Sequence, residues 1–272
     1  MRSVRKFVRN GLVATVDLSR SWSSPSNGKR VIALHDIADA SSFRDKMTWL
    51  REQYDVVSMD RFLNEETSRK PEESQRTQVA ITFDDGFESW HEIAAPILDD
   101  LELPAVFFIC SGFVGLQGSE AHDFSRRHLR RHSQLKPLTN DQLLDLSGNP
   151  RFEIGSHTVN HVNLNRQFPP GRLSSEIDAD RAKLEDWTGN PVRLFAYPFG
   201  GPTNISYQSI DFVRKSGFTA AFSFIPGYWD PQRGRHTIGR DGLDIKAPTW
   251  LWHAWLNGSY DALYKVKSKL IK

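Results

Sequence analysis

The sequence contains the stretch Val79-Ala80-Ile81-Thr82-Phe83-Asp84-Asp85-Gly86-Phe87, in which an apolar strand runs directly into two adjacent carboxylates and a glycine. Like charges raise each other's pKa, so two neighbouring aspartates at a strand end are costly unless a positive group or a metal ion lies beside them. The same residues also suit a simple turn in which Asp85 and Gly86 serve only geometry. At this point the sequence leaves a metal site and a structural turn open.

Strand-like and helix-like segments alternate along the chain on both sides of this stretch. Alternating β and α units predict a parallel sheet, because each helix returns the chain to start the next strand in the same direction. About eight strands, with no Gly-x-Gly-x-x-Gly turn after the first, favour a barrel over an open dinucleotide-binding sheet. The predicted strands are 30–35, 55–58, 78–84, 105–110, 152–157, 193–198, 218–223 and 236–240, and the predicted helices are 42–53, 90–101, 139–147, 174–188 and 206–216.

Polar residues follow these predicted strands at the points where the strands end. They are His35, Asp84 with Asp85, Ser156 with His157, and Tyr197 with Pro198. In (β/α) barrels the carboxyl ends of the strands meet at one rim, and this rim carries the chemistry. We therefore expect these side chains to converge.

Two histidines four residues apart follow a predicted strand in the segment Gly155-Ser156-His157-Thr158-Val159-Asn160-His161. If the turn after His157 is helical, both imidazoles lie on one face and can bind one metal ion. With Asp85 they make a three-ligand site that keeps positions open for water, as catalytic zinc sites require. Asp84 is then free to act as a general base. The same ligands fit a non-haem iron oxygenase, a function that would leave Asp84 and His35 without roles.

Three ordered motifs stand in the chain: Thr-Phe-Asp-Asp-Gly at 82–86, His-Thr-x-x-His at 157–161 and Tyr-Pro-Phe-Gly at 197–200. Together they resemble the polysaccharide deacetylase family, also called the NodB-homology family or carbohydrate esterase family 4. The resemblance implies a deformed (β/α) barrel and a metal-dependent hydrolase that removes N-acetyl groups from a carbohydrate. It also implies that Asp84 is the general base and that Asp85, His157 and His161 bind the metal, usually zinc. The backbone N–H of Tyr197 is the implied oxyanion donor.

Two features depart from the pattern of that family. Most members carry an arginine that orients the base two residues before the motif's proline, and this chain has Ala196 there. We expect Arg240 to substitute for it. The segment Val31-Ile32-Ala33-Leu34-His35-Asp36 resembles an element that most members carry near the C-terminus, in the permuted order of the exopolysaccharide (poly-N-acetylglucosamine) deacetylases. That resemblance implies His35 as the general acid, with a structural histidine as the alternative. The missing arginine also leaves open a carbohydrate-binding barrel with weak or no turnover.

Substrate contacts are expected from the turn after strand 193–198 and from an aromatic segment. Glycines in Pro198-Phe199-Gly200-Gly201 would let a sugar approach the backbone closely, although the segment also suits a plain turn. We therefore predict contacts from Pro198 and Gly200. We also predict that Trp229 stacks on a sugar, a half-exposed core residue being the alternative. The predicted partner is a carbohydrate that bears N-acetyl groups.

Composition excludes several classes of function. The 35 basic and 33 acidic residues give a formal net charge of +2, so no overall field draws the protein to nucleic acid. The single cysteine, Cys110, excludes internal disulfides and lies in an apolar run typical of a buried thiol. With 272 residues, 39% of them hydrophobic, the chain fits one large globular domain. The oligomeric state stays open.

We divide the chain into three regions. In the N-terminal extension, 1–28, basic residues and an apolar stripe predict an amphipathic helix that packs on the protein or contacts a membrane surface. The barrel, 29–246, carries a basic insertion at 112–137, which is either a solvated helix or a mobile, anion-recognising loop at the rim. A helical segment, 247–272, follows. No apolar run reaches the roughly 18 residues of a membrane span, and the N-terminal run is too short for a cleaved signal peptide. We expect a cytoplasmic protein or one peripheral to the membrane.

Overall fold

The computed structural model describes residues 28–64, 76–131 and 135–261 of the chain. Within them, eight strands form one sheet, and every strand pairing in it is parallel. The strands are β1 Lys29–Leu34, β2 Asp55–Val56, β3 Gln78–Asp85, β4 Ala105–Ile109, β5 Phe152–Ser156, β6 Leu194–Ala196, β7 Ala220–Phe222 and β8 Asp241–Gly242. Their order in the sheet is β7-β6-β5-β4-β3-β1-β8, and β2 pairs with β3 off this path.

The sheet curls until its two ends are bridged by one segment, 238–242. Ile238 pairs with Phe222 of β7, and the next residues, Asp241 and Gly242, pair with β1. This arrangement confirms the predicted deformed barrel. The predicted bounds of the last strand, 236–240, were wrong, because the segment makes a single bridge to β7 before it crosses to β1 and forms β8 there.

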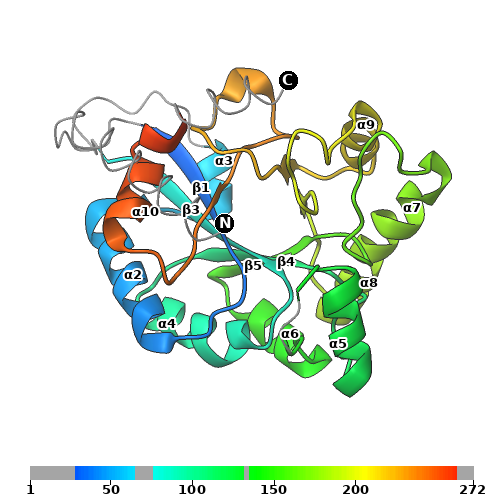
Figure 1. Ribbon diagram of the computed structural model, residues 1–272, viewed down its shortest axis with the longest axis horizontal. Coiled ribbons are helices and arrows are strands. Elements are labelled where there is room, and N and C mark those ends of the chain that lie inside the picture. The colour runs from blue at the N-terminus through cyan, green and yellow to red at the C-terminus, as the bar shows by residue number, and fades with distance from the viewer. Residues whose placement is uncertain (1–27, 65–75, 132–134, 262–272) are drawn as a thin grey trace, which may run out of the picture.

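Helices cover the outside of the curved strands (Figure 1). They are α2 Ala40–Gln53, α3 Met59–Asn64, α4 Ala95–Asp100, α5 Gly118–Arg127, α6 Asn140–Gly148, α7 Leu173–Glu176, α8 Asp178–Thr188, α9 Tyr207–Lys215 and α10 Thr249–Leu256, with a π-helical turn at Trp90–Ala94 and 3-10 turns at Pro170–Arg172 and Pro231–Arg233. Two predicted helices are divided. The predicted helix 90–101 is divided near Pro96, which has no N–H to bond back into the turn before α4. The predicted helix 174–188 is divided where α7 ends, and there Glu176 O accepts from the N–H of Val159.

The alternation of side chains along each strand builds two cores. On β4, Val106 and Phe108 face the barrel interior, where they pack with residues such as Phe222 and Ile238. Phe107 and Ile109 face the opposite way, into the layer between sheet and helices. Gly155 makes room for this interior, because a Cβ there would lie 2.4 Å from the Phe108 ring. The barrel is therefore filled with side chains, and the polar strand ends lie above a packed floor.

The predicted regions at the two ends of the chain are only partly covered by the structure. Residues 1–27 of the predicted N-terminal extension lie outside the described residues, as do 262–272 at the other end. Helix α5 lies in the basic insertion, and α10 lies in the C-terminal segment. None of the helices in 28–64, 76–131 or 135–261 combines the length and apolar character needed to cross a bilayer.

Candidate active site

The structure gathers most of the predicted site residues at one rim of the barrel. Leu34 of β1 pairs with Phe83 of β3, so the residues that follow them, His35 and Asp84, lie side by side at the carboxyl ends of the two strands. Ile109 of β4 pairs with both Asp85 and Ser156, which brings the start of the histidine motif next to the aspartates. The carboxyl ends of parallel strands meet here as expected.

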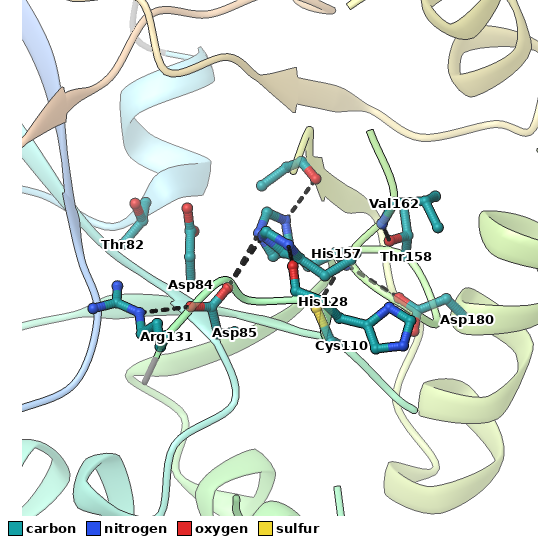
Figure 2. Close-up of polar contacts among 12 residues, drawn as sticks. Thr82, Asp84, Asp85, Cys110, His128, Arg131, His157, Thr158, Val162 and Asp180 are labelled. Atoms are coloured by element: carbon teal, nitrogen blue, oxygen red, sulfur yellow. Dashed lines mark hydrogen bonds and ion pairs between the residues drawn. The ribbon is translucent and has the colours of Figure 1, made fainter. Parts of the chain in front are cut away.

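Asp85, His157 and His161 point their ligand atoms at one another at this rim, and Figure 2 shows the first two. Asp85 Oδ1 lies 3.7 Å from His157 Nε2 and 3.4 Å from His161 Nε2. The Nδ1–H of His157 donates to Ala196 O at 2.7 Å, and that of His161 donates to His128 O at 3.0 Å. Each bond leaves Nε2 as the unprotonated nitrogen. Burial lowers the pKa of both imidazoles to about 4, so both are neutral at pH 7.

These atoms fit a divalent cation. Asp85 Oδ1 is buried, and no hydrogen-bond donor reaches it among the described residues. Two lone pairs and a carboxylate oxygen that face one another without a donor repel each other unless something positive lies between them. Ligand atoms about 2.0–2.1 Å from a tetrahedral zinc ion lie roughly 3.4 Å apart, close to both distances above. The backbone of Asp85 is held at a φ of 99°, a strained value for a residue with a side chain, as is common at functional sites.

Cys110 is a competing ligand at the same place. Its thiol lies with Asp85 and His157 in a group whose ligand atoms are all within 4.8 Å of one another. The thiol, however, donates to His157 O at 3.3 Å, and burial raises its pKa well above the usual value. It is therefore a protonated, buried thiol, as predicted from the sequence, and a metal prefers the thiolate form.

The loop that carries the two histidines is not the helical turn considered from the sequence. Thr158 and His161 both have left-handed backbone, with φ of 65° and 49°. The two imidazoles converge as predicted, because the loop folds back on itself. The helical turn that was expected to bring them together is absent. Left-handed residues with side chains are costly, and the surrounding contacts must hold them.

Two buried carboxylates, which sequence reasoning missed, supply those contacts. Asp180 of α8 accepts from the N–H groups of Ser111 and His157 and from the hydroxyl of Ser156. Burial raises its pKa to about 6, against the effect of these donors. Glu176 of α7 accepts from the backbone and side-chain N–H groups of Asn160. Both acids lie in a predicted helix, where nothing in the local pattern separates them from solvated helix residues.

Asp84 is gripped by Arg240 inside the barrel. Nη1 of Arg240 donates to Oδ1 at 2.6 Å and Nη2 donates to Oδ2 at 2.7 Å, while Nε donates to Ser223 O. Burial alone would raise the pKa of Asp84, but the charge of Arg240, aided by His157, lowers it to about 2. The methyl group of Ala196 cannot make this contact, and the guanidinium reaches the carboxylate from Arg240, the residue just before β8.

His35 is partly buried beside both aspartates. Burial lowers its pKa, and the nearby charges of Asp85 and Asp84 act in the opposite direction without cancelling that effect. Its backbone is fixed by the indole N–H of Trp90, which donates to His35 O at 2.9 Å. Its ring meets Phe224 edge-on, with 6.0 Å between the centroids. The imidazole is thus neutral at pH 7 and lies next to the predicted base.

The basic insertion reaches the site through His128, Arg130 and Arg131. His128 O orients His161, as described above. Arg131 Nε lies 4.0 Å from Asp85 Oδ2, on the side of that carboxylate away from His157 (Figure 2). The guanidinium of Arg130 lies over the ring of Phe199, 4.6 Å from its centroid. Phe199 in turn meets His161 edge-on at 4.5 Å.

The backbone N–H of Tyr197, expected to hold an oxyanion, instead belongs to the sheet. It donates to Phe222 O at 2.9 Å, and the Tyr197 hydroxyl donates to His236 O at 3.1 Å. The side chain is buried. This donor is already used in closing the barrel, so the role predicted for Tyr197 does not fit the structure.

The turn after β6 also differs from expectation. Pro198 and Gly200 are buried, and a Cβ on Gly200 would lie 2.5 Å from the backbone nitrogen of Phe224. The space left by the missing Cβ is therefore filled by the backbone at Phe224 and not by a sugar, so the predicted contact from Gly200 was wrong. Phe199 is the partly exposed member of the turn, with a left-handed φ of 61°. Within the described residues, no hydrogen-bond acceptor faces its N–H.

Trp229 lies at the other end of the barrel. Its backbone N–H donates to the carbonyl of Lys29, the first residue of β1. The site, in contrast, follows the last residue of that strand. Its ring stacks on Phe62 with 5.3 Å between centroids. The predicted sugar-stacking role is therefore wrong, and the half-exposed core residue considered as the alternative is what the structure shows.

Comparison with known proteins adds independent findings. A sequence profile of the family described as polysaccharide deacetylase matches residues 72–221. The chain is 23% identical over 238 residues to the poly-beta-1,6-N-acetyl-D-glucosamine N-deacetylase of Escherichia coli strain K12, a match that covers 75% of this chain. It spans only about a third, 35%, of that protein's length. It is 26% identical over 190 residues to the protein of the same name from Staphylococcus aureus strain MSSA476, covering 67% of this chain and 59% of that one.

Two solved structures share the fold. IcaB from Ammonifex degensii superposes with a TM-score of 0.67 at 20% identity, over 85% of this chain and 97% of that one. The BpsB deacetylase domain from Bordetella bronchiseptica gives a TM-score of 0.66 at 17% identity, over 82% of this chain and 98% of that one. At these identities the likeness establishes the architecture alone.

Proposed function

Because this chain belongs to the polysaccharide deacetylase family, we propose that it hydrolyses N-acetyl groups from a carbohydrate with the help of a bound divalent metal ion, of which zinc is our choice. One observation carries the proposal. Asp85, His157 and His161 direct three unprotonated ligand atoms at one point, next to a second, arginine-held carboxylate. Related proteins are named as N-deacetylases of poly-beta-1,6-N-acetyl-D-glucosamine, which makes that polymer our first substrate to test.

Asp85, His157 and His161 would hold the ion through one carboxylate oxygen and two Nε2 atoms. When bound, such an ion supplies Lewis acidity toward an amide carbonyl and a water molecule. The protein contributes preorganisation: backbone carbonyls of Ala196 and His128 fix both imidazole rings, so neither must reorient to bind. Two neutral ligands and one anionic ligand leave net positive charge in the site, which favours polarisation of the substrate carbonyl.

Asp84 is the group that we propose takes the proton from the attacking water. Arg240 uses one lone pair on each carboxylate oxygen, and a second lone pair on each remains for a proton. The grip keeps Asp84 charged and oriented, although the low pKa makes it a weak base. Its contribution is therefore mainly position, and proton transfer from an acidified water needs little basicity.

His35 is the group that we propose returns a proton to the departing amine. Burial lowers its pKa, so His35 holds a proton less readily than a free imidazole, and turnover that depends on protonated His35 should fall as the pH rises. For the oxyanion we propose the N–H of Phe199 in place of that of Tyr197. Phe199 contacts His161, and its N–H has no acceptor within the described residues. A donor held in this way costs no reorganisation during the reaction.

The contact between Arg240 and Asp84 argues against both alternative functions, a carbohydrate-binding barrel and an iron oxygenase. A barrel that binds carbohydrate without turnover was considered because Ala196 replaces the arginine that orients the base. Arg240, just before β8, makes the contact with Asp84. An iron oxygenase would use the same three ligands, but it would leave the buried Asp84–Arg240 pair without a role.

Metal content and acetate release test the proposal together. We expect about one zinc ion per chain by mass spectrometry after loading, and little or none in His157→Ala. Acetate release from a poly-β-1,6-N-acetylglucosamine oligomer should require the ion and be slowed at least about 100-fold in His35→Gln. A wild-type chain that takes up no ion on loading, or a loaded chain that releases no acetate from any N-acetylated saccharide, would overturn the proposed function.

A further inference from the structure

We propose that the loop 128–131 recognises an anionic group of the phosphate type, carried by the acetylated sugar beside its reacting amide. The inference rests on the proposed function, because it places this group next to the same site. It names a substrate class that a neutral poly-N-acetylglucosamine does not represent. Arg130 and Arg131 of this loop lie beside the site, and the preceding arginines of α5 already pair with Asp123.

The loop is fixed to the site at both ends. His128 O accepts from His161 Nδ1 at 3.0 Å, and Arg131 Nε lies 4.0 Å from Asp85 Oδ2. The N–H of Arg131 also donates to Ser125 O in α5, which closes the loop back on its helix. Arg130, between these anchors, has a left-handed φ of 56°. A strained backbone held from both sides presents its side chain in a defined direction.

Arg130 differs from the other arginines of the same basic stretch. Arg126 and Arg127 both pair with Asp123, at 3.0 and 3.2 Å, which accounts for their charge as helix-surface ion pairs. Arg130 has no carboxylate partner in residues 28–64, 76–131 and 135–261. Its guanidinium lies on the ring of Phe199 instead, and that ring touches His161. An exposed positive charge thus lies one aromatic ring away from a candidate metal ligand.

Arg131 adds a second charge beside the same site. Its side chain is 37% exposed and lies over Phe87, with its nearest carboxylate, Asp85, at 4.0 Å. That distance is too long for a hydrogen bond, and Asp85 is the residue whose charge a bound cation would take up. The guanidinium therefore has donors left for an outside partner. Two guanidinium groups beside one reacting centre make a neutral saccharide an incomplete match.

Phosphate is the anion that this arrangement suits best. A guanidinium presents parallel N–H donors that match two phosphate oxygens, and such charge-assisted bonds are about twice as strong as neutral ones. The contact with Phe199 restricts the Arg130 side chain before binding, so less entropy is lost on contact. The same chemistry is offered by a sugar 1-phosphate and by a sugar in a phosphodiester or diphosphate linkage. The substrates below distinguish these sources.

The test compares N-acetylglucosamine derivatives of the same α configuration with the metal-loaded full chain. We would measure kcat/KM for acetate release from methyl N-acetyl-α-glucosaminide, N-acetyl-α-glucosamine 1-phosphate and UDP-N-acetylglucosamine. We expect a phosphate-bearing sugar to exceed the neutral glycoside by about tenfold at low salt, with the advantage shrinking as salt rises. The better of the two phosphorylated sugars identifies a monoester or a diphosphate source. Arg130→Gln should lower the ratio of phosphorylated to neutral turnover about fivefold.

Arg126→Gln is the matched control, because it removes an arginine of the same stretch that already has Asp123 as its partner, and it should leave the ratio unchanged. A second measurement, the Kd of N-acetylglucosamine 1-phosphate for Asp84→Asn by calorimetry, reads binding without turnover. Adding Arg130→Gln to that variant should weaken binding about fivefold. Equal turnover of charged and neutral sugars, or a ratio indifferent to Arg130→Gln, would overturn the inference and leave the deacetylase proposal standing. The proposed function keeps its own test, acetate release from the poly-β-1,6-N-acetylglucosamine oligomer. If none of the three derivatives is turned over, the calorimetric comparison decides whether the loop binds the phosphate, and equal Kd values with and without Arg130→Gln would overturn the inference.

Discussion

Replacing Arg240 with glutamine removes the guanidinium that grips both oxygens of the buried Asp84 carboxylate. Burial alone would raise the pKa of Asp84, and Arg240 is the strongest of the groups that lower it to about 2. The change from 3.8 to about 2 corresponds to roughly 2–3 kcal/mol, since one pKa unit is a tenfold change in an equilibrium constant. Removing one partner of a buried pair typically costs about 3–5 kcal/mol. We therefore expect Arg240→Gln to lower the free energy of unfolding by about 3 kcal/mol.

Urea unfolding at pH 7 and acetate release measure the two consequences. A misplaced base should lower kcat/KM at least about 100-fold in Arg240→Gln. Arg240→Lys keeps the charge without the two-pronged contact, so it should recover stability better than activity. The sign of the pH effect follows from the carboxylate. In the wild type Asp84 stays deprotonated throughout the assay range, whereas in Arg240→Gln burial acts without its main opponent and raises the pKa of Asp84 above 3.8. The acidic limb of the kcat/KM profile should therefore move to higher pH.

A double-mutant cycle provides the decisive outcome. If Asp84 and Arg240 act as one pair, Asp84→Asn and Arg240→Gln together should be less destabilising than the sum of the two single changes, by at least about 2 kcal/mol. Additive destabilisation, or wild-type kcat/KM in Arg240→Gln, would refute the reasoning. Arg235→Gln is the control, because Arg235 precedes the same strand segment and donates to Leu63 O without touching Asp84.

Three further outcomes follow from the same geometry. Asp84→Asn should retain the metal, because it leaves all three proposed ligands in place, yet release acetate about 1,000-fold more slowly; turnover within tenfold of the wild type would remove Asp84 from the role of base. His161→Ala should lose the ion while Cys110→Ala keeps it, both measured by mass spectrometry after dialysis; loss of metal from Cys110→Ala alone would show that the thiol is the third ligand. Asp180→Ala leaves three buried donors without an acceptor, so urea unfolding should show a loss of about 3 kcal/mol or more, together with weaker retention of metal through His157; full stability would show that this carboxylate does not hold the loop.

Much of the fold could be predicted from the sequence because its signals are local. The alternation of strand-like and helix-like segments specifies a parallel sheet, and most predicted bounds of these segments lie close to those of the structure. Errors fell at boundaries set by distant partners. The last strand is the clearest case, since its pairing depends on the divergence of β7 and β1 and not on its own residues.

The candidate ligands were readable for the same local reason. Asp84 and Asp85 follow one strand, His157 follows another, and parallel strands that end together bring such residues together whatever lies between them. Which ring nitrogen of each histidine would face a metal could not be predicted from the sequence. It depends on which ring nitrogen each histidine gives to a backbone carbonyl, and the carbonyls of Ala196 and His128 come from different parts of the chain.

Only the tertiary structure decided how the remaining donors and surfaces are used. Arg240 meets Asp84 across 156 residues of sequence, the Tyr197 N–H is taken by Phe222 O, and Trp229 lies at the wrong end of the barrel for a sugar. Each of these outcomes is a competition for one partner among groups that the fold brings together, and a sequence states which groups exist but not which of them meet. The motifs therefore determined the chemistry available to this protein, and the closing of the sheet determined which side chains are placed to perform it.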